Sequence, residues 1–333
     1  MQIREEITSV ADKLPWGGLV HSAVVRNKDY SLMGFFQYTA QNLSEKTIPI
    51  QHFRNGWSLW TEKQHLPGQE DKYYMTLNWN PFYDQSNRII NTLNKKAISV
   101  EESIPYFYQT LQQLENSFSP HVQVQILKDD AIISYLRSTL CTLRSAPLTD
   151  RPLYLDALLS QDLQFTFRAQ DLQIDGQTIG IVTPLGDPEQ SKLHILFDRL
   201  QEYPYRFARR FLFSDASTYK RDQERYMDKW CAGRSSMLEL IRKHLGQGQI
   251  FAYDAKSILF WNQDTDSLEI AIRQAETAMK ELGIPCIIEN YNLKDIFWGS
   301  LPGLFRANLT PPAVKLKDMT EIFIEKISEK ENY

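Results

Sequence analysis

A chain of 333 residues is longer than one small hydrophobic core requires, which favours about two domains. Its 42% hydrophobic and 23% charged residues are typical of a globular protein, and a net charge of −4 argues against nucleic-acid binding over the whole surface. The three cysteines are far apart and give neither a metal-ligand spacing nor a disulfide framework. No stretch reaches the ~18 apolar residues that a membrane span needs.

Residues 1–145 are expected to form an N-terminal lobe of antiparallel strands followed by helices. Alternating and aromatic-rich segments predict strands over 19–25, 30–38, 57–61 and 73–79. From Ser99, apolar residues recur every three or four positions, and Ser99 with Glu102 forms a capping box, so a helix should begin there. After Pro120 the pattern predicts a strand over 121–127 and a second helix from Asp129 or Asp130 to about Leu143.

Residues 146–312 are expected to form an α/β sandwich lobe with a mixed sheet and long helices. The predicted strands are 163–168, 178–184, 206–213, one within 249–261, and 284–288; the predicted helices are 190–202, 216–244, 265–282 and a short one after Asn292. The fold class is therefore α+β, with a strand-rich first lobe. Residues 313–333 should form a connector helix, centred on about 317–328, that leads toward a further domain.

The motifs that carry chemistry give a mostly negative result. No G-x-x-x-x-G-K-[ST] occurs, so a P-loop is excluded. Residues 250–254 have the look of a Walker B strand, but a strand that ends in a capping Asp254 explains them without a nucleotide. The six histidines are scattered singly, without a metal or nucleophile spacing. The sequence therefore predicts no catalytic, cofactor-binding or metal-binding residue.

Residues 205–245 are locally basic. This segment contains ten basic and five acidic residues, which gives a local net charge of +5. Tyr219, Tyr226 and Trp230 are interleaved among them. One interpretation is a surface for nucleic acid or an acidic partner, on which Arg221 and Arg225 would lie. The other is a solvated helix with internal ion pairs and a buried aromatic stripe, which the helical spacing of the aromatics favours.

Residues 283–312 combine a short apolar run, a short helix and a sharp exit at Pro302 and Gly303. Trp298, Leu301 and Phe305 within this stretch could form an exposed apolar anchor for a partner. Packing into the core explains the same three residues equally well.

Several weak motifs occur in a distinctive order along nearly the whole chain. They are Leu14-Pro15-Trp16, Gly56-Trp57, Thr76-Leu77-Asn78-Trp79-Asn80-Pro81, Arg209-Arg210-Phe211-Leu212-Phe213 and Trp298-Gly299-Ser300-Leu301-Pro302-Gly303. In this order the chain resembles the N-terminal domain of the TrbE/CagE-type conjugation ATPases, the fourth VirB component of type IV secretion systems.

This resemblance implies a non-catalytic chain without a cofactor of its own, because the ATP and magnesium sites of the family lie in a RecA-like motor that follows this region. It further implies a docking and oligomerisation domain, cytoplasmic and peripheral on the bacterial inner membrane, that anchors the motor for pilus biogenesis and substrate transfer. The implied partners are inner-membrane secretion components, notably the small third VirB component, and the motor domain itself. The alternative function is a nucleic-acid-binding module that uses the basic 205–245 region.

Overall fold

The computed structural model describes residues 19–22, 31–40, 56–79, 100–118, 122–127, 129–141, 163–168, 171–185, 190–214, 250–302 and 313–316. The strands are β1 (Leu19–Ser22), β2 (Ser31–Ala40), β3 (Trp57–His65), β4 (Lys72–Trp79), β5 (Val122–Ile126), β6 (Phe165–Arg168), β7 (Asp171–Ile174), β8 (Gln177–Pro184), β9 (Tyr205–Ser214), β10 (Ile250–Asn262), β11 (Cys286–Ile288) and β12 (Ala313–Leu316). The helices in this part of the chain are α3 (Val100–Phe118), α4 (Asp129–Ser138), α6 (Gln190–Arg199), α9 (Thr265–Glu281) and α10 (Leu293–Ser300).

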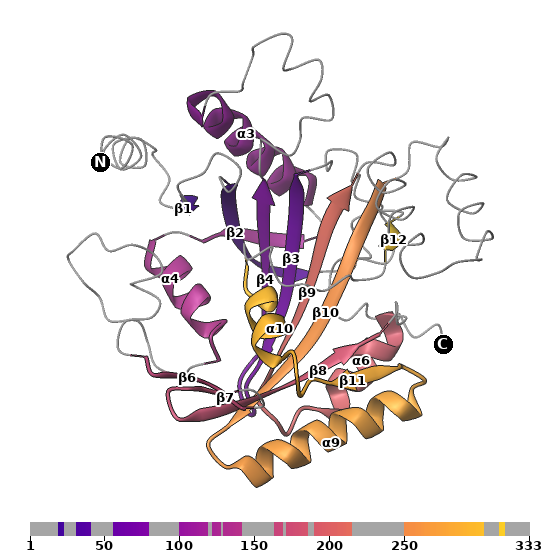
Figure 1. Ribbon diagram of the computed structural model, residues 1–333. Helices are drawn as coiled ribbons and strands as arrows, with labels where there is room; N and C mark the ends of the chain where they lie inside the picture. The colour runs from indigo at the N-terminus through magenta and orange to yellow at the C-terminus, as the bar shows by residue number, and fades with distance from the viewer. Residues whose placement is uncertain are drawn as a thin grey trace, which may run out of the picture.

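One twelve-stranded sheet runs through the molecule (Figure 1). Its main path has the order β1-β2-β4-β3-β9-β10-β8-β7-β6, with β5 beside β2, β12 beside β10, and β11 beside β8. Every pair of strands in it is antiparallel. The predicted α+β class is confirmed, and the sheet is larger than the sequence indicated.

The mixed sheet expected for residues 146–312 is wrong for the residues described. β8 and β9 are joined through α6, as in a parallel crossover, but β10 lies between them and is antiparallel to both. β11 then pairs with the other edge of β8. The resulting chain order, β8-α6-β9-β10-α9-β11, is the β-α-β-β-α-β order of a ferredoxin-like unit.

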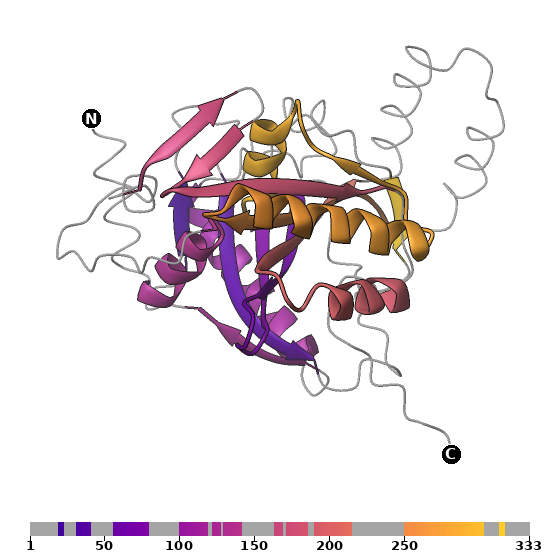
Figure 2. The same ribbon diagram turned by 90° about the horizontal axis from the view of Figure 1, so that it is seen from below.

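The helices cover opposite faces of the sheet. α6 and α9 lie on one face of the ferredoxin-like unit, and α10 lies on the other face of β8 (Figure 2). The first core packs Phe197 of α6 and Met279 of α9 against Tyr205 and Ile258. The approach of α9 to β8 is close, because a Cβ at Gly180 would lie 2.3 Å from Cδ1 of Ile272. Glycine at this position therefore sets the spacing between α9 and the sheet.

α10 forms the second core with strands β7, β8, β9 and β10. Leu293, Ile296 and Phe297 of this helix are buried beside Ile181 and Leu259. The short helix predicted after Asn292 is thereby confirmed, and its apolar side chains are buried. Asn292 is the residue before the first helical turn, but its side chain makes no capping hydrogen bond.

The predicted two lobes share this one sheet. β3 of the first and β9 of the second pair over eight positions, from Ser58 opposite Leu212 to His65 opposite Tyr205. The expected boundary at residue 145, the helix over 216–244 and the helix over 317–328 lie outside the described residues. Residues 313–316, at the start of the expected connector segment, form β12 and pair with β10.

Candidate interaction site around helix α10

Two arginines of β9 bind the C-terminal turn of α10. Arg206 donates a hydrogen bond from Nη2 to Ser300 Oγ, and Arg210 donates from Nη1 to the carbonyl oxygen of Gly299 over 3.3 Å. Ser300 Oγ in turn donates to the carbonyl oxygen of Phe297 over 2.7 Å. The bonds to Gly299 and Phe297 use carbonyl groups that a helix end leaves without intrahelical partners, so they help to fix where α10 stops.

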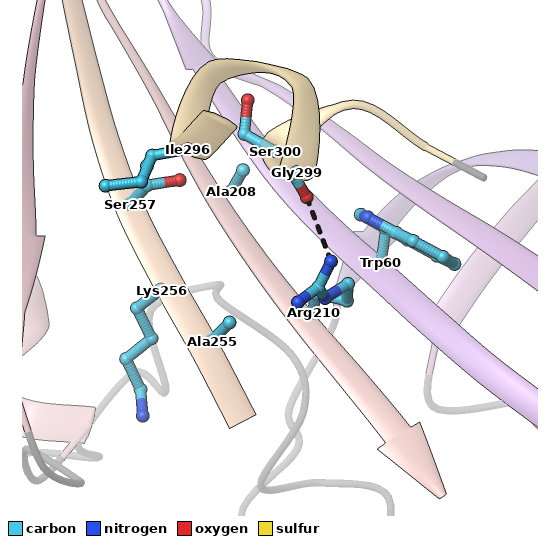
Figure 3. Close-up of a pocket in the computed structure, with 9 residues that line it drawn as sticks. All are labelled: Trp60, Ala208, Arg210, Ala255, Lys256, Ser257, Ile296, Gly299 and Ser300. Carbon is cyan, nitrogen blue, oxygen red and sulfur yellow. Dashed lines mark hydrogen bonds between the residues drawn. The ribbon is translucent and has the colours of Figure 1, made fainter. Parts of the chain in front are cut away.

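Figure 3 shows how little space remains beneath α10. Arg210 reaches up to Gly299 beside Trp60, while Ala208 and Ser257 come from the strands below. The cavity among them has a volume of about 10 Å³, room for one water molecule at most. Burial lowers the pKa of Arg210, because a guanidinium ion loses hydration there. The interior under α10 is therefore charged and closed. Such a space suits a structural contact between helix and sheet rather than a substrate-binding site.

The contact of Arg206 extends into a buried polar network on the same face. Arg206 Nη1 lies 3.5 Å from both carboxylate oxygens of Glu62 on β3. Tyr135 of α4 donates to Glu62 Oε1 over 3.1 Å, and its hydroxyl lies 3.1 Å from Thr76 Oγ1 of β4. The network thus joins α4, α10 and three strands through one carboxylate.

Burial dominates the protonation of this network. Glu62 and Arg206 are both 0% exposed, and removal from water raises the pKa of Glu62 despite the nearby Arg206, Tyr135 and Gln64. A separation of 3.5 Å is long for a charged hydrogen bond, so Arg206 does not compensate the lost hydration. Burial, with Glu62 nearby, also raises the pKa of Tyr135. The hydroxyl of Tyr135 therefore remains a donor.

A second charged cluster lies on the opposite face of β9. Asp254 accepts hydrogen bonds from Arg209 Nε at 3.1 and 3.2 Å and from Arg209 Nη2 at 2.7 Å, and Lys256 Nζ also contacts it. Burial acts to raise the pKa of Asp254, but the two cations outweigh it and hold this pKa below its usual range. The predicted strand over 249–261 is confirmed, but β10 continues eight residues beyond Asp254. Asp254 is therefore not a strand-ending cap, and its function in the structure is to neutralise two buried cations.

The predicted surface residues have different outcomes. Arg221, Arg225 and Phe305 lie outside the described residues. Leu301 is 7% exposed and belongs to the core beneath α10, so for Leu301 the exposed anchor is wrong and the core interpretation holds. Trp298 is half-buried and packs edge-on against Phe297, with ring centroids 5.4 Å apart. Three basic residues of the 205–245 segment, Arg206, Arg209 and Arg210, are buried on β9 and so add no positive charge to a surface.

Sequence reasoning missed the partners of these arginines. Glu62 and Tyr135 stand in segments that were interpreted only as a strand and a helix, without any marker of a buried ion. One signal was present: Arg206, Arg209 and Arg210 interrupt a strand that is otherwise apolar and aromatic. Charges in such a strand require buried partners or a surface.

Two other features, a membrane-spanning helix and a metal-binding group, are absent from the residues that the structure describes. None of their helices is both long enough and apolar enough to cross a lipid bilayer. Groups of three or more metal-ligating side chains are likewise absent from the described part of the chain.

Comparison with known proteins shows which proteins the chain resembles around this site. Residues 212–310, which include β10, α9, β11 and α10, match the family described as "CagE, TrbE, VirB family, component of type IV transporter system". The match begins within β9 and ends beyond the Trp-Gly-Ser-Leu-Pro-Gly motif. Over these residues the chain is thus similar to components of type IV transporter systems.

Individual relatives agree with this class. The chain is 20% identical to the conjugal transfer protein TrbE of Rhizobium radiobacter, over 94% of this chain and 49% of TrbE. It is 22% identical to a probable conjugal transfer protein TrbE of Sinorhizobium fredii (strain NBRC 101917 / NGR234), over 51% of this chain and 29% of that protein. The chain thus spans about half the length of the first relative and less of the second. The predicted kinship with the TrbE/CagE-type proteins is confirmed.

Proposed function

We propose that this chain is a docking and oligomerisation domain of a type IV conjugation ATPase. In this proposal it anchors the motor at the inner-membrane complex for pilus biogenesis and substrate transfer, and it does not itself bind or hydrolyse ATP. The parent protein would carry the ATP and magnesium sites in its motor domain. The partners would be inner-membrane components, including a small protein of the third-VirB-component type, and the chain would lie peripherally on the cytoplasmic side of the membrane.

One observation supports this proposal most strongly. The similarity to TrbE covers nearly all of this chain but only half of TrbE, and the 333 residues contain no P-loop sequence. The charges at the centre of the sheet also fit an architectural role. Arg206, Arg210 and Glu62 are engaged in fastening helices to strands, in a space too small for a nucleotide.

The first test is calorimetry with ATP and magnesium, together with a phosphate-release assay on the whole chain. No heat of binding and no phosphate above the buffer rate are expected. Saturable ATP binding with turnover would contradict the non-catalytic assignment.

The second test concerns docking. Inner-membrane vesicles that contain a third-VirB-component-type protein should sediment the chain, and vesicles without that protein should leave it in solution. Tyr291, 84% exposed beside α10, is the position to vary, with the exposed Ile270 of α9 as its matched control. If docking uses the α10 face, Tyr291→Ala should reduce co-sedimentation about tenfold, a loss of about 1.4 kcal/mol. Ile270→Ala should change it little, and equal sedimentation with both kinds of vesicle would contradict docking through this partner.

A further inference from the structure

Strand β11 forms one edge of the ferredoxin-like unit. It lies between α9 and α10 in the chain and pairs with β8 over Cys286–Ile288 (Figure 1). Among the strands that the structure describes, only β8 pairs with it. An edge strand presents unpaired N–H and C=O groups on its outer side, where another strand can be added.

The hydrogen bonds to β8 show which main-chain groups of β11 point outward. Glu289 N donates to the carbonyl oxygen of Ile181 over 2.9 Å, so Glu289 faces β8 with its main chain. In an antiparallel pair, every second residue is hydrogen-bonded to the same neighbouring strand. Ile288 and Cys286 lie one and three positions before Glu289. Their N–H and C=O groups therefore point away from β8, to the outer side of β11.

The local sequence leaves this outer side open. Edge strands are commonly protected by a charged side chain or by a proline. β6 and β12, at other edges of the sheet, carry Arg168 and Lys315, but residues 284–288 carry no charge. Pro285 does not block the outer side, because its main chain faces β8 and its carbonyl oxygen accepts a hydrogen bond from Leu185 N over 2.7 Å.

Apolar side chains flank the outer edge of β11 on both faces of the sheet. Cys286 and Ile288 are partly buried against the core that α6 and α9 share. Ile287 points to the opposite face, because successive residues of a strand alternate, and it is 47% exposed. Leu185, the residue after β8, is 41% exposed. A strand added at this edge would therefore remove apolar surface from water as well as pair main-chain groups.

We propose that β11 pairs with β11 of a second copy of this chain, antiparallel and about a two-fold axis through Ile287. In this register Cys286 of each copy faces Ile288 of the other, so the outward N–H and C=O groups of both residues find partners. A register centred on Cys286 would set Ile288 opposite Ile284. The N–H of Ile284 is already bonded to the carbonyl oxygen of Met279 over 2.8 Å. The arrangement about Ile287 is thus self-complementary, as a two-fold interface must be.

Symmetry and charge favour a second copy as the partner. A copy brings the matching pattern of donors and acceptors without any further requirement on its sequence. The chain has a net charge of −4, so two copies repel each other least where their surfaces are neutral, as over residues 284–288. A strand of three residues is a small contact, so the dimer should be weak and reversible. The inference deepens the proposed oligomerisation role and rests on the proposed function for its biological meaning.

Sedimentation velocity of the whole chain over a hundredfold range of concentration tests this pairing. The wild type should shift from monomer to dimer as the concentration rises. Ile287→Lys should abolish the shift, because two like charges would face each other across the axis. Ile270→Lys, at a 53% exposed position of α9, is the matched control and should dimerise as the wild type does. A wild type that stays monomeric, or an Ile287→Lys variant that is folded and still dimerises, overturns the proposal.

A cross-link tests the register without adding a charge. In the proposed dimer the two Ile287 residues form a pair without hydrogen bonds, with Cα atoms about 4.5 Å apart, which a disulfide can bridge. Cys231→Ser and Cys286→Ser first remove two native thiols. In that background, Ile287→Cys should give a disulfide-linked dimer under mild oxidation, and Ile270→Cys should stay monomeric on a non-reducing gel. A dimer in sedimentation without a cross-link at position 287 would overturn the proposal.

Amide hydrogen exchange identifies what covers the edge. The amides of Cys286 and Ile288 should exchange more slowly at high than at low concentration of the chain. If only vesicles with the third-VirB-component-type protein slow these two amides, the edge belongs to that partner and the second-copy assignment is overturned. Vesicle docking by a chain that stays monomeric would refute the pairing and leave the proposed docking function standing. A dimer without vesicle docking would support the pairing and refute the docking function.

Discussion

Arg206 and Arg209 are three residues apart on β9, yet they illustrate two different ways to bury a charge. Asp254 receives three short contacts from Arg209 and a further one from Lys256, and its pKa falls. Glu62 contacts one cation among the described residues, Arg206 at 3.5 Å, and its pKa rises. Burial is nearly complete in both cases. The difference teaches that the number and closeness of cations, rather than burial, decide whether a carboxylate stays ionised inside this sheet.

The two clusters also connect different parts of the molecule. The Asp254 cluster joins neighbouring strands β9 and β10, so it stabilises the sheet itself. The Glu62 cluster joins the sheet to α4 and α10 through the hydroxyls of Tyr135 and Ser300. We therefore expect the first cluster to control global stability and the second to control the attachment of the two helices.

The largest loss of folding stability should come from Asp254→Asn. This change leaves Arg209 and Lys256 buried without their shared anion, and breaking a buried ion pair in this way costs about 3–5 kcal/mol. Urea unfolding followed by circular dichroism measures the loss. Asp264→Asn is the control, because Asp264 is an exposed helix cap and asparagine caps about as well. A loss below about 1 kcal/mol for Asp254→Asn would contradict the importance given to this cluster.

A smaller and local effect is expected for Ser300→Ala. Arg206 loses a buried hydrogen-bond acceptor, which costs about 2 kcal/mol. Hydrogen exchange should accelerate in the amides of α10 while those of β9 and β10 remain protected. Ser267→Ala, at the exposed start of α9, is the matched control and should not alter α10. Uniform acceleration over the sheet would show that the Ser300 contact does not act on the helix alone.

The third prediction concerns how the contributions of Asp254 and Glu62 to folding stability change with pH. The folded-state pKa of Asp254 is lowered, so its stabilising contribution is present above the unfolded value of about 3.9 and is lost as pH falls through the folded-state pKa. The folded-state pKa of Glu62 is raised, so ionisation in the unfolded chain removes stability as pH rises above about 4.3.

Urea unfolding from pH 3 to 7 tests these two opposite pH dependences. The stability of wild type relative to Asp254→Asn should increase with pH at the acid end. Relative to Glu62→Gln the stability of wild type should decrease as pH rises above about 4.3, because the raised pKa of Glu62 keeps it protonated in the folded state. If the stability of wild type relative to each variant changed with pH in the same direction, the contrast between the two clusters would be refuted.

The smallest contribution to stability should come from an exposed ion pair. Arg273 and Glu269 are paired one turn apart on the exposed side of α9. A double-mutant cycle with Arg273→Ala and Glu269→Ala should give a coupling smaller than the loss of stability in any variant of the buried clusters, because water screens both charges. A coupling as large as the loss for Ser300→Ala would mean that exposure does not separate this pair from the buried clusters.

Local patterns predicted the individual elements well. Alternation predicted β4, and helical periodicity predicted α3 and α9 to within a few residues. They failed at β7, over which no strand was predicted and which Asp175 and Gly176, residues typical of a turn, follow directly. A four-residue strand offers too little alternation to be recognised beside such a turn.

The sheet order and the buried charges could not be predicted in this way. Arg206 meets Glu62 across 144 residues and Arg209 meets Asp254 across 45. Nothing within a local window shows that such residues meet, so the arginines of β9 were counted only as part of the locally basic segment 205–245. The same limit applies to β10, whose position between β8 and β9 depends on pairing rather than on propensity.

The seam between β3 and β9 bears on how this protein can be divided. A cut at the expected boundary near residue 145 would leave each fragment with eight positions of unpaired strand edge, within a sheet whose core lies on both faces. Exposed edges of that length recruit other strands. Separately produced halves should therefore aggregate when alone and recombine when mixed, and a reporter split at this point would assemble through the seam.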